Sequence, residues 1–156
     1  MIRRGAIFSE CRIWRYFLWR TWKPDKPICM FVGLNPSKAD ENDNDNTVSR
    51  CQKFAFDWGY GSLWMMNIFA YCATDPTDML SAKDPVGIEN NKYLKCASNW
   101  ADIIIACWGN DGNHLNRALD VESLLKNKLW CLKRTLQGEP AHPLYLPGNL
   151  KPIKYK

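Results

Sequence analysis

Four polar motifs stand where apolar segments of this chain end, and their residue types suit a pocket for a small molecule or a nucleobase. Asn35 lies in GLNPS after the apolar segment ICMFV, and Asn67 ends SLWMMN. Asn110 follows Trp108-Gly109, and His142 lies in the sequence AHP. Polar groups that converge on the rim of a sheet are what a pocket for a small molecule or a base needs.

Each motif also has a purely structural interpretation. Asn35 before Pro36 can shape a turn, and Asn67 can end a strand with its amide bonded to backbone. Asn110 can cap a helix, and His142 can be a solvated loop residue. The argument for a pocket is that all four are expected at one edge of the fold.

The surrounding pattern alternates strands and helices. Apolar segments at 28–37, 62–70, 101–109 and 128–135 are typical of buried strands, and helices are expected at 48–59, 88–100 and 113–126, the first capped by Thr47. The alternation predicts an α/β fold, a three-layer α/β/α sandwich around a short, mainly parallel four-stranded sheet. Ligands of such sheets bind beyond the carboxyl ends of the strands, where the four motifs fall.

The remaining segments are less regular. Residues 12–22 mix Arg with aromatic residues, and their periodicity fits either a strand pair or a short helix. Residues 39–47 form an acidic polar loop, residues 73–87 hold two Asp-Pro pairs, and residues 138–148 form a proline-rich loop.

Length and composition indicate one domain over residues 1–156. The chain is 46% hydrophobic and 13% aromatic, which excludes disorder, and domains of roughly 100–200 residues are usual. No run of about 18 apolar residues is present, and the N-terminus lacks a signal-peptide core, so we expect a cytoplasmic protein without a membrane partner. Seven cysteines without a CxxC pair predict reduced core thiols, and we expect no metal and no other cofactor.

Charge is distributed unevenly along the chain. Residues 1–26 hold seven Lys and Arg against two acids, and residues 126–156 hold seven against one, whereas the formal net charge of the whole chain is only +5. Basic ends around an acidic centre indicate either a surface that tracks phosphates or merely a soluble one.

The motifs resemble those of the uracil-DNA glycosylase superfamily in order and spacing over residues 28–147. GLNPS resembles the first motif in the GxNP form of the mismatch-specific and thymine-DNA branches. LWMMN is similar to the strand that ends in the base-reading Asn, IIACWGN to the strand that ends in Trp-Gly, and AHPLYLP to the late His-Pro motif with its wedge loop. The string from LNPSKAD to FAFDWGYG also resembles an uncharacterised phage and bacterial LNPS-type family, which we interpret as part of the same superfamily.

The resemblance implies a role for each site residue. Asn35 would orient the attacking water, and His142 would donate to the pyrimidine O2. Asp43 or Asp45 would stabilise charge or take a proton, and the sequence leaves the choice between them open. The base would be held by Gly33, Leu34, Pro36, Ser37, Asn67, Trp108 and Asn110. The gap left by the flipped nucleotide would be filled by Leu144, Tyr145 and Leu146.

One departure bears on the substrate. Strict uracil enzymes carry a bulky Tyr after the Pro of the first motif, where this chain has Ser37. The resemblance therefore implies a monomeric, monofunctional DNA glycosylase that removes a C5-substituted pyrimidine from duplex DNA. Hydroxymethylated or glucosylated cytosine of phage DNA is an example, and the activity would serve in anti-phage defence. The alternatives are a hydrolase or transferase for free modified nucleosides or nucleotides, and a non-catalytic nucleic-acid-binding module.

Overall fold

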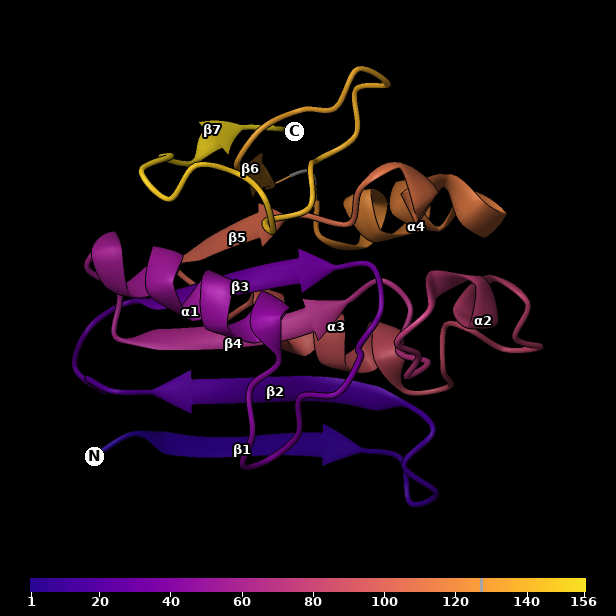
Figure 1. Ribbon diagram of the computed structural model, residues 1–156, viewed down its shortest axis with the longest axis horizontal. Coiled ribbons are helices and arrows are strands. Elements are labelled where there is room, and N and C mark those ends of the chain that lie inside the picture. The colour runs from indigo at the N-terminus through magenta and orange to yellow at the C-terminus, as the bar shows by residue number, and fades with distance from the viewer. Residues whose placement is uncertain (127) are drawn as a thin grey trace.

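One mixed sheet of seven strands organises the computed structural model, which describes residues 1–126 and 128–156 (Figure 1). The strand order is β1-β2-β4-β3-β5-β6-β7. The strands are β1 (Arg3–Phe8), β2 (Arg15–Thr21), β3 (Ile28–Gly33), β4 (Ser62–Asn67), β5 (Ile103–Ala106), β6 (Trp130–Cys131) and β7 (Ile153–Lys154). The helices are α1 (Asn46–Asp57), α2 (Pro76–Leu80), α3 (Asn90–Ser98) and α4 (Arg117–Leu124), with a 3-10 segment η1 (Asn110–Asn116).

The centre of the sheet is parallel and its edges are antiparallel. β3 lies between β4 and β5 and runs parallel to both, and β6 runs parallel to β5. β2 pairs antiparallel with β4 and with β1, while β7 pairs antiparallel with β6. β3 is buried along almost its whole length, as expected for a parallel strand covered on both faces.

The predicted fold class is wrong. The sheet has seven strands of mixed direction, where a short, mainly parallel four-stranded sheet in a three-layer sandwich was expected. The two segments responsible are 3–21 and 153–154, which add an antiparallel pair beside β4 and a short strand beside β6. β1 and β7 are edge strands and only partly buried, so they carry no clean period-2 pattern. In β2 the pattern is obscured because Arg15 and Arg20 are buried although they are charged.

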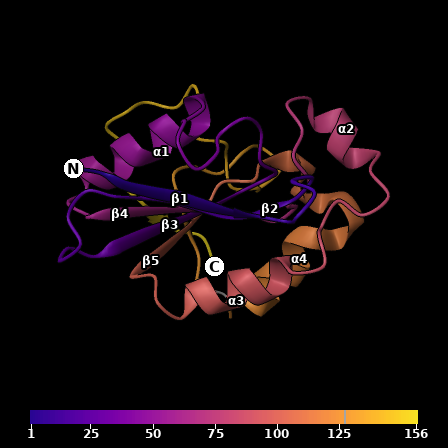
Figure 2. The ribbon, with the colours of Figure 1, turned by 90° about the horizontal axis from the view of Figure 1, so that it is seen from below.

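Helices cover both faces of the sheet, as Figure 2 shows, with α1 on one side and α3 and α4 on the other. Side chains alternate accordingly along β3. Phe31 packs in the cluster that holds Phe54 of α1, whereas Met30 and Val32 pack in the cluster that holds Leu94 of α3.

Two of the expected helices begin differently. Asp45, and not Thr47, caps α1, since its carboxylate accepts a hydrogen bond from the Val48 N–H. The helix expected over 113–126 is divided into η1 and α4 by non-helical backbone at His114 and Leu115. Within the described residues, no helix is both long and apolar enough to cross a membrane.

Candidate functional site

A pocket of about 260 Å³ opens where the central parallel strands end. Gly33 at the end of β3 lies opposite Asn67 at the end of β4, and Cys107 follows β5. The pocket is below the roughly 300–1,000 Å³ typical of drug-sized ligands, so it suits a small ring system such as one base.

The pocket brings together most of the residues that the sequence predicts for the site. It is lined by Gly33, Leu34, Asn35, Pro36, Ser37, Asp45, Asn67, His142 and Leu144. The other predicted residues do not line it, namely Asp43, Trp108, Asn110, Tyr145 and Leu146.

The side-chain amide of Asn35 is held by its nitrogen. Nδ2 donates to the backbone oxygen of Ala73 at 2.9 Å and to that of Pro36 at 3.0 Å. Oδ1 accepts no hydrogen bond from the described residues and is not sealed off from solvent. Asn35 therefore presents a hydrogen-bond acceptor to the pocket. A bound water molecule can donate a hydrogen bond to this oxygen.

The amide of Asn67 is held the other way round. Its Oδ1 accepts from Nη2 of Arg15 at 3.1 Å, while its Nδ2 has no partner among the described residues. Although Asn67 is only 3% exposed, Nδ2 is not a sealed atom, so it faces the pocket. Space for it depends on Gly33, because a Cβ there would lie 3.0 Å from Nδ2. Asn67 therefore presents a donor.

Arg15 is a charged residue of the pocket that the sequence does not predict. It lies at the start of β2, lines the pocket and is only 2% exposed. Burial lowers the pKa of its guanidinium to about 10, while the nearby carboxylate of Asp45 acts in the opposite direction. The group is thus cationic at neutral pH, and its Nε has no partner within the described chain. Its one sequence signal is a single Arg beside the apolar segment YFLW.

His142 enters the pocket from the proline-rich loop. The residue is exposed at the rim, yet partial desolvation of the ring lowers its pKa below the ordinary 6.5, with Asp45 again opposing the shift, so the neutral ring predominates at pH 7. Its Nδ1 accepts from the Leu144 N–H at 3.2 Å. In the neutral ring this bond assigns the proton to Nε2, which can then donate to a ligand.

Of the two candidate acids, Asp45 lines the pocket and Asp43 does not. The Asp45 carboxylate accepts from the Val48 N–H at 2.9 Å and the Ala39 N–H at 3.4 Å, so it also fixes the start of α1. A carboxylate has further lone pairs, which leaves Asp45 able to accept from water as well.

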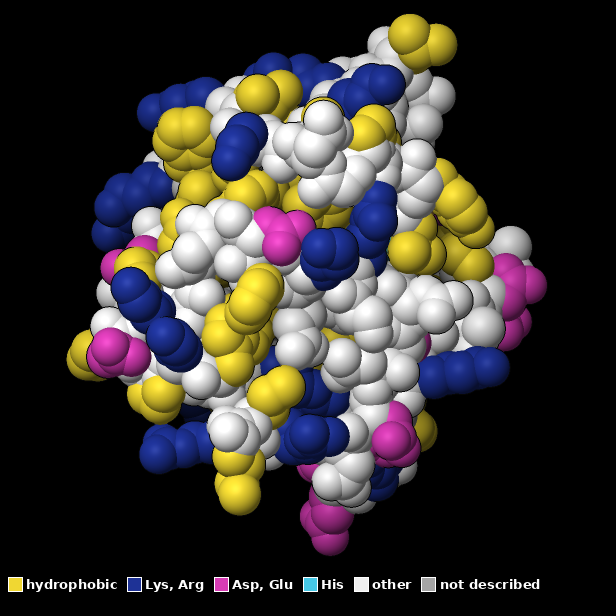
Figure 3. All heavy atoms as spheres, turned by 60° about the vertical axis from the view of Figure 1, so that its left-hand side comes forward, with side chains coloured by type: hydrophobic (Ala, Val, Ile, Leu, Met, Phe, Trp, Pro, Cys, Tyr) yellow, Lys and Arg dark blue, Asp and Glu magenta, His cyan; other side chains and the backbone are white. Residues whose placement is uncertain are grey.

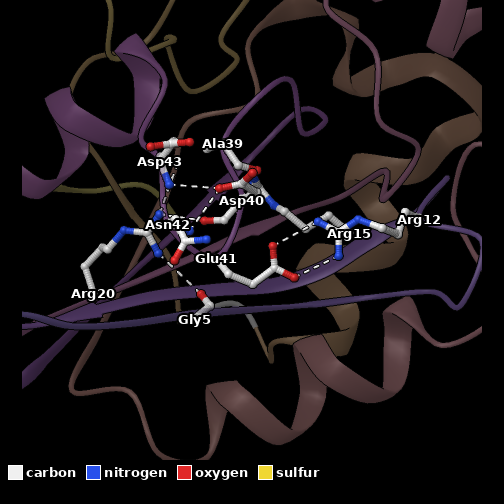
Figure 4. A network of polar contacts seen from close by, with 9 residues as sticks. All are labelled: Gly5, Arg12, Arg15, Arg20, Ala39, Asp40, Glu41, Asn42 and Asp43. Carbon is white, nitrogen blue, oxygen red and sulfur yellow. Dashed lines mark hydrogen bonds and ion pairs between the residues drawn. The ribbon is translucent and has the colours of Figure 1, made fainter.

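The acidic loop that contains Asp43 is anchored by arginines of the N-terminal strand pair and its connection (Figure 4). Arg20 donates to the backbone oxygens of Asp40 at 2.7 Å and Asp43 at 3.2 Å, and Arg12 forms a two-pronged ion pair with Glu41. Arg12 also lowers the pKa of Glu41 to about 2. The position of Asp43 is therefore explained by loop anchoring.

The side chains of Trp108 and Asn110 do not line the pocket. Trp108 is 1% exposed and its Nε1 donates to Glu139 at 3.1 Å, so its ring belongs to the core on the side of α3 and α4. Asn110 accepts from the Thr135 hydroxyl at 2.7 Å on the surface. The prediction that both line the base pocket does not agree with these positions.

The three predicted wedge residues lie in different surroundings. Leu144 lines the pocket, and Tyr145 is 99% exposed with φ of +70°. Leu146 packs against the core beneath α1, and its carbonyl accepts from the Arg50 guanidinium. Only Tyr145 thus projects fully into solvent beside the pocket.

Basic residues are spread over a face on the side opposite the strand ends that form the pocket. Figure 3 brings forward the side where β3 and β4 begin, and Lys and Arg side chains spread over much of that face. Two arginines of the basic N-terminal segment, Arg15 and Arg20, are buried and hold the acidic loop. Because both are buried, they add no positive charge to the exposed surface that the charge of residues 1–26 predicts as one possibility.

Of the cysteines, only Cys107 lines the pocket among the described residues. Cys29, Cys51, Cys107 and Cys131 are buried as small core residues, whereas Cys11 and Cys96 are exposed. Within residues 1–126 and 128–156, no three His, Cys, Asp or Glu side chains are grouped closely enough to hold a metal ion.

Comparison with curated proteins gives no match, and neither does comparison with solved structures. A family model described as "Protein of unknown function (DUF1643)" matches residues 15–144. That range begins at Arg15 and ends at Leu144, so it contains every residue that lines the pocket. The chain belongs to the DUF1643 family.

Proposed function

We propose that this protein is a monofunctional DNA glycosylase that hydrolyses the N-glycosidic bond of a flipped pyrimidine. The supporting observation is the fixed amide of Asn35, whose NH2 is held by two backbone carbonyls while its Oδ1 faces the pocket. An acceptor fixed in this way can hold a water molecule in one orientation, and positioning of reactants is worth several powers of ten in rate.

The base would enter the pocket between Asn67 and His142. The Asn67 NH2 would donate to one edge of the base, and the His142 Nε2–H would donate to O2. Because unstacking a nucleotide costs a few kcal/mol, both bonds would help to hold the extruded base.

In the reaction, the oxygen of the water held by Asn35 forms a bond to C1′ of the sugar. The bond from C1′ to N1 of the base breaks, and its electron pair stays on the base. His142 stabilises the negative charge that this places on O2. The proton lost by the water passes to Asp45, whose carboxylate also favours the positive charge that develops on the sugar. An abasic site and a base anion result, and the anion becomes the free base when it takes up a proton from Asp45 or from solvent.

The rim of the pocket suits a pyrimidine with a substituent at C5. Ser37 and Thr74 line the pocket, and their hydroxyls bond to each other at 3.3 Å on the exposed side. No bulky side chain occupies the position of Ser37, so a substituent would extend toward solvent there. Tyr145, which is fully exposed beside the pocket, would fill the gap in the duplex.

The test is base release from duplex DNA that carries uracil, mismatched thymine, hydroxymethylcytosine or glucosylated hydroxymethylcytosine, with abasic sites revealed by alkaline cleavage. We expect release of one or more of these bases, and a loss of about 100-fold in Asn35→Ala with DNA affinity retained. Asn99→Ala, an exposed asparagine after α3, is the matched control and should release base at the wild-type rate.

Three outcomes would contradict the proposal. Equal release by Asn35→Ala would remove the role of the oriented water. Release from free nucleosides without release from DNA would favour a nucleoside hydrolase. Salt-sensitive DNA binding without any product would favour a binding module.

A further inference from the structure

Arg15 is the one charged side chain that is both buried in the fold and part of the pocket wall without belonging to the proposed reaction. Its guanidinium donates to the Ala39 carbonyl at 3.2 Å and to Oδ1 of Asn67 at 3.1 Å. Its Nε remains buried without a partner in the described chain.

The contact with Arg15 decides which end of the Asn67 amide faces the pocket. If the amide were flipped, its NH2 would point at the guanidinium, and two donors would face each other in a buried place. Because a buried donor without an acceptor loses its hydrogen bonds to water and gains none in return, the flipped amide is disfavoured. Asn90 further fixes the residue by donating to the Asn67 backbone oxygen at 3.0 Å.

We infer that Arg15 makes Asn67 a hydrogen-bond donor, and that the pocket therefore selects a base whose facing edge carries an acceptor. The inference rests on the proposed binding of a base in this pocket. Either a ring carbonyl such as O4 or an unprotonated ring nitrogen such as N3 meets the requirement. An amino group placed against Nδ2 does not, because donor would meet donor.

The experiment uses pentanucleotides with one central test base and abasic analogues at the other four positions, so that no flipping cost or competing base intervenes. The test bases are uracil, pyrimidin-2-one and pyridin-2-one. Uracil offers O4, pyrimidin-2-one offers N3, and pyridin-2-one offers neither while keeping O2. An all-abasic pentanucleotide gives the contribution of the backbone. Binding is measured with Asn35→Ala protein, so that turnover does not interfere.

We expect uracil, pyrimidin-2-one or both to bind at least tenfold more tightly than pyridin-2-one. Comparison of uracil with pyrimidin-2-one then shows whether Asn67 recognises a carbonyl oxygen or a ring nitrogen. Equal binding of all three bases, or no binding above the all-abasic baseline, overturns the inference.

Variants added to the Asn35→Ala protein separate a positioning role of Arg15 from a structural one. Asn67→Asp keeps the shape and the contact with Arg15 but lacks the donor, so it should lose the preference for acceptors. Arg15→Met should reduce the preference to within about threefold, because the amide can then rotate, whereas Arg15→Lys can still donate to Oδ1 and should retain it. If Arg15→Met affected all pentanucleotides alike, including the abasic one, the role would be structural only.

Failure of this inference is distinguishable from failure of the proposed function. Base selection is read from binding to a protein that lacks the water-positioning amide, and it needs no turnover. A protein that discriminates among the pentanucleotides but releases no base from DNA would retain the inference and lose the glycosylase. If Arg15→Met does not fold, Asn67→Asp and Arg15→Lys still decide the question.

Discussion

Asn35 and Asn67 end neighbouring segments of the same sheet edge and line the same pocket, yet they present opposite groups to it. Asn35 is held by its nitrogen and offers an oxygen, whereas Asn67 is held by its oxygen and offers a nitrogen. A side-chain amide can present either its oxygen or its nitrogen to a pocket, because rotation of the amide group exchanges the two. The partners behind each amide therefore determine what the pocket can bind.

The two sets of partners also differ in kind. Asn35 depends on the backbone oxygens of Pro36 and Ala73, which are acceptors of fixed polarity. Asn67 depends on the cationic side chain of Arg15, which comes from the edge strand pair. The same substitution should consequently have different effects at the two positions.

The largest effect is expected from changing each amide to a carboxylate. Asn35→Asp would place a negative charge against two carbonyl oxygens and remove both donated bonds, so we expect the free energy of unfolding to fall by about 2–3 kcal/mol. Asn67→Asp would place a carboxylate against Arg15, and we expect a change within about 1 kcal/mol because desolvation and attraction nearly cancel. Urea unfolding at pH 7 measures both.

Asn149→Asp, on an exposed loop, is the control for added charge and should change stability by no more than about 0.5 kcal/mol. Equal destabilisation at positions 35 and 67 would show that the two amides are not held in opposite ways.

A second test acts on the Asn67 side alone. In Gly33→Ala the new Cβ would lie 3.0 Å from Nδ2 of Asn67 and 3.2 Å from Cε of Met65, so the amide must move. We expect about a tenfold loss of affinity for the acceptor-bearing pentanucleotides, equivalent to about 1.4 kcal/mol, with unfolding measured alongside. Gly148→Ala meets only ordinary contacts and should leave binding unchanged, whereas unchanged binding in Gly33→Ala would argue against Nδ2 as the reading group.

A third test uses pH, because His142 titrates and neither amide does. Its pKa is below 6.5 in the folded protein, so the unfolded chain binds more protons in the window below pH 6.5. The free energy of unfolding should therefore rise with pH through that window and level off above it. His142→Gln should flatten this part of the profile, and an unchanged slope would mean that another group carries it.

The smallest effect is expected at Tyr145 on the rim, whose side chain forms no hydrogen bond with the described residues. Tyr145 adopts φ of +70°, which costs little for glycine but is unfavourable for tyrosine. Tyr145→Gly should leave stability equal or higher by about 0.5 kcal/mol, and should weaken duplex binding several-fold without affecting the pentanucleotides. Loss of pentanucleotide binding would place Tyr145 inside the base site rather than beside it.

Much of the pocket was predictable from local sequence. GLNPS and AHP are short loops that follow or face buried strands, and their residues line the pocket because parallel strands bring their carboxyl ends to one edge. Trp108 and Asn110 were misplaced for a physical reason. The end of a strand determines where the backbone of a residue lies, but it does not determine where the side chain points. The side chain of Trp108 points into the core, where it packs and donates a hydrogen bond to Glu139.

The sequence by itself determined the central strands, the polar motifs at their ends and the mainly core character of the cysteines, because these depend on periodicity and residue type along short segments. Only the tertiary structure decided the mixed seven-stranded sheet and the placement of Asp45, and not Asp43, in the pocket. It also decided the hydrogen bond from Arg15 to the side-chain oxygen of Asn67. These features depend on contacts between residues as far apart as Arg15 and Asn67, and a hydrogen bond across that separation leaves no local pattern. The polarity of the pocket is therefore a property of the fold and not of the motifs that line it.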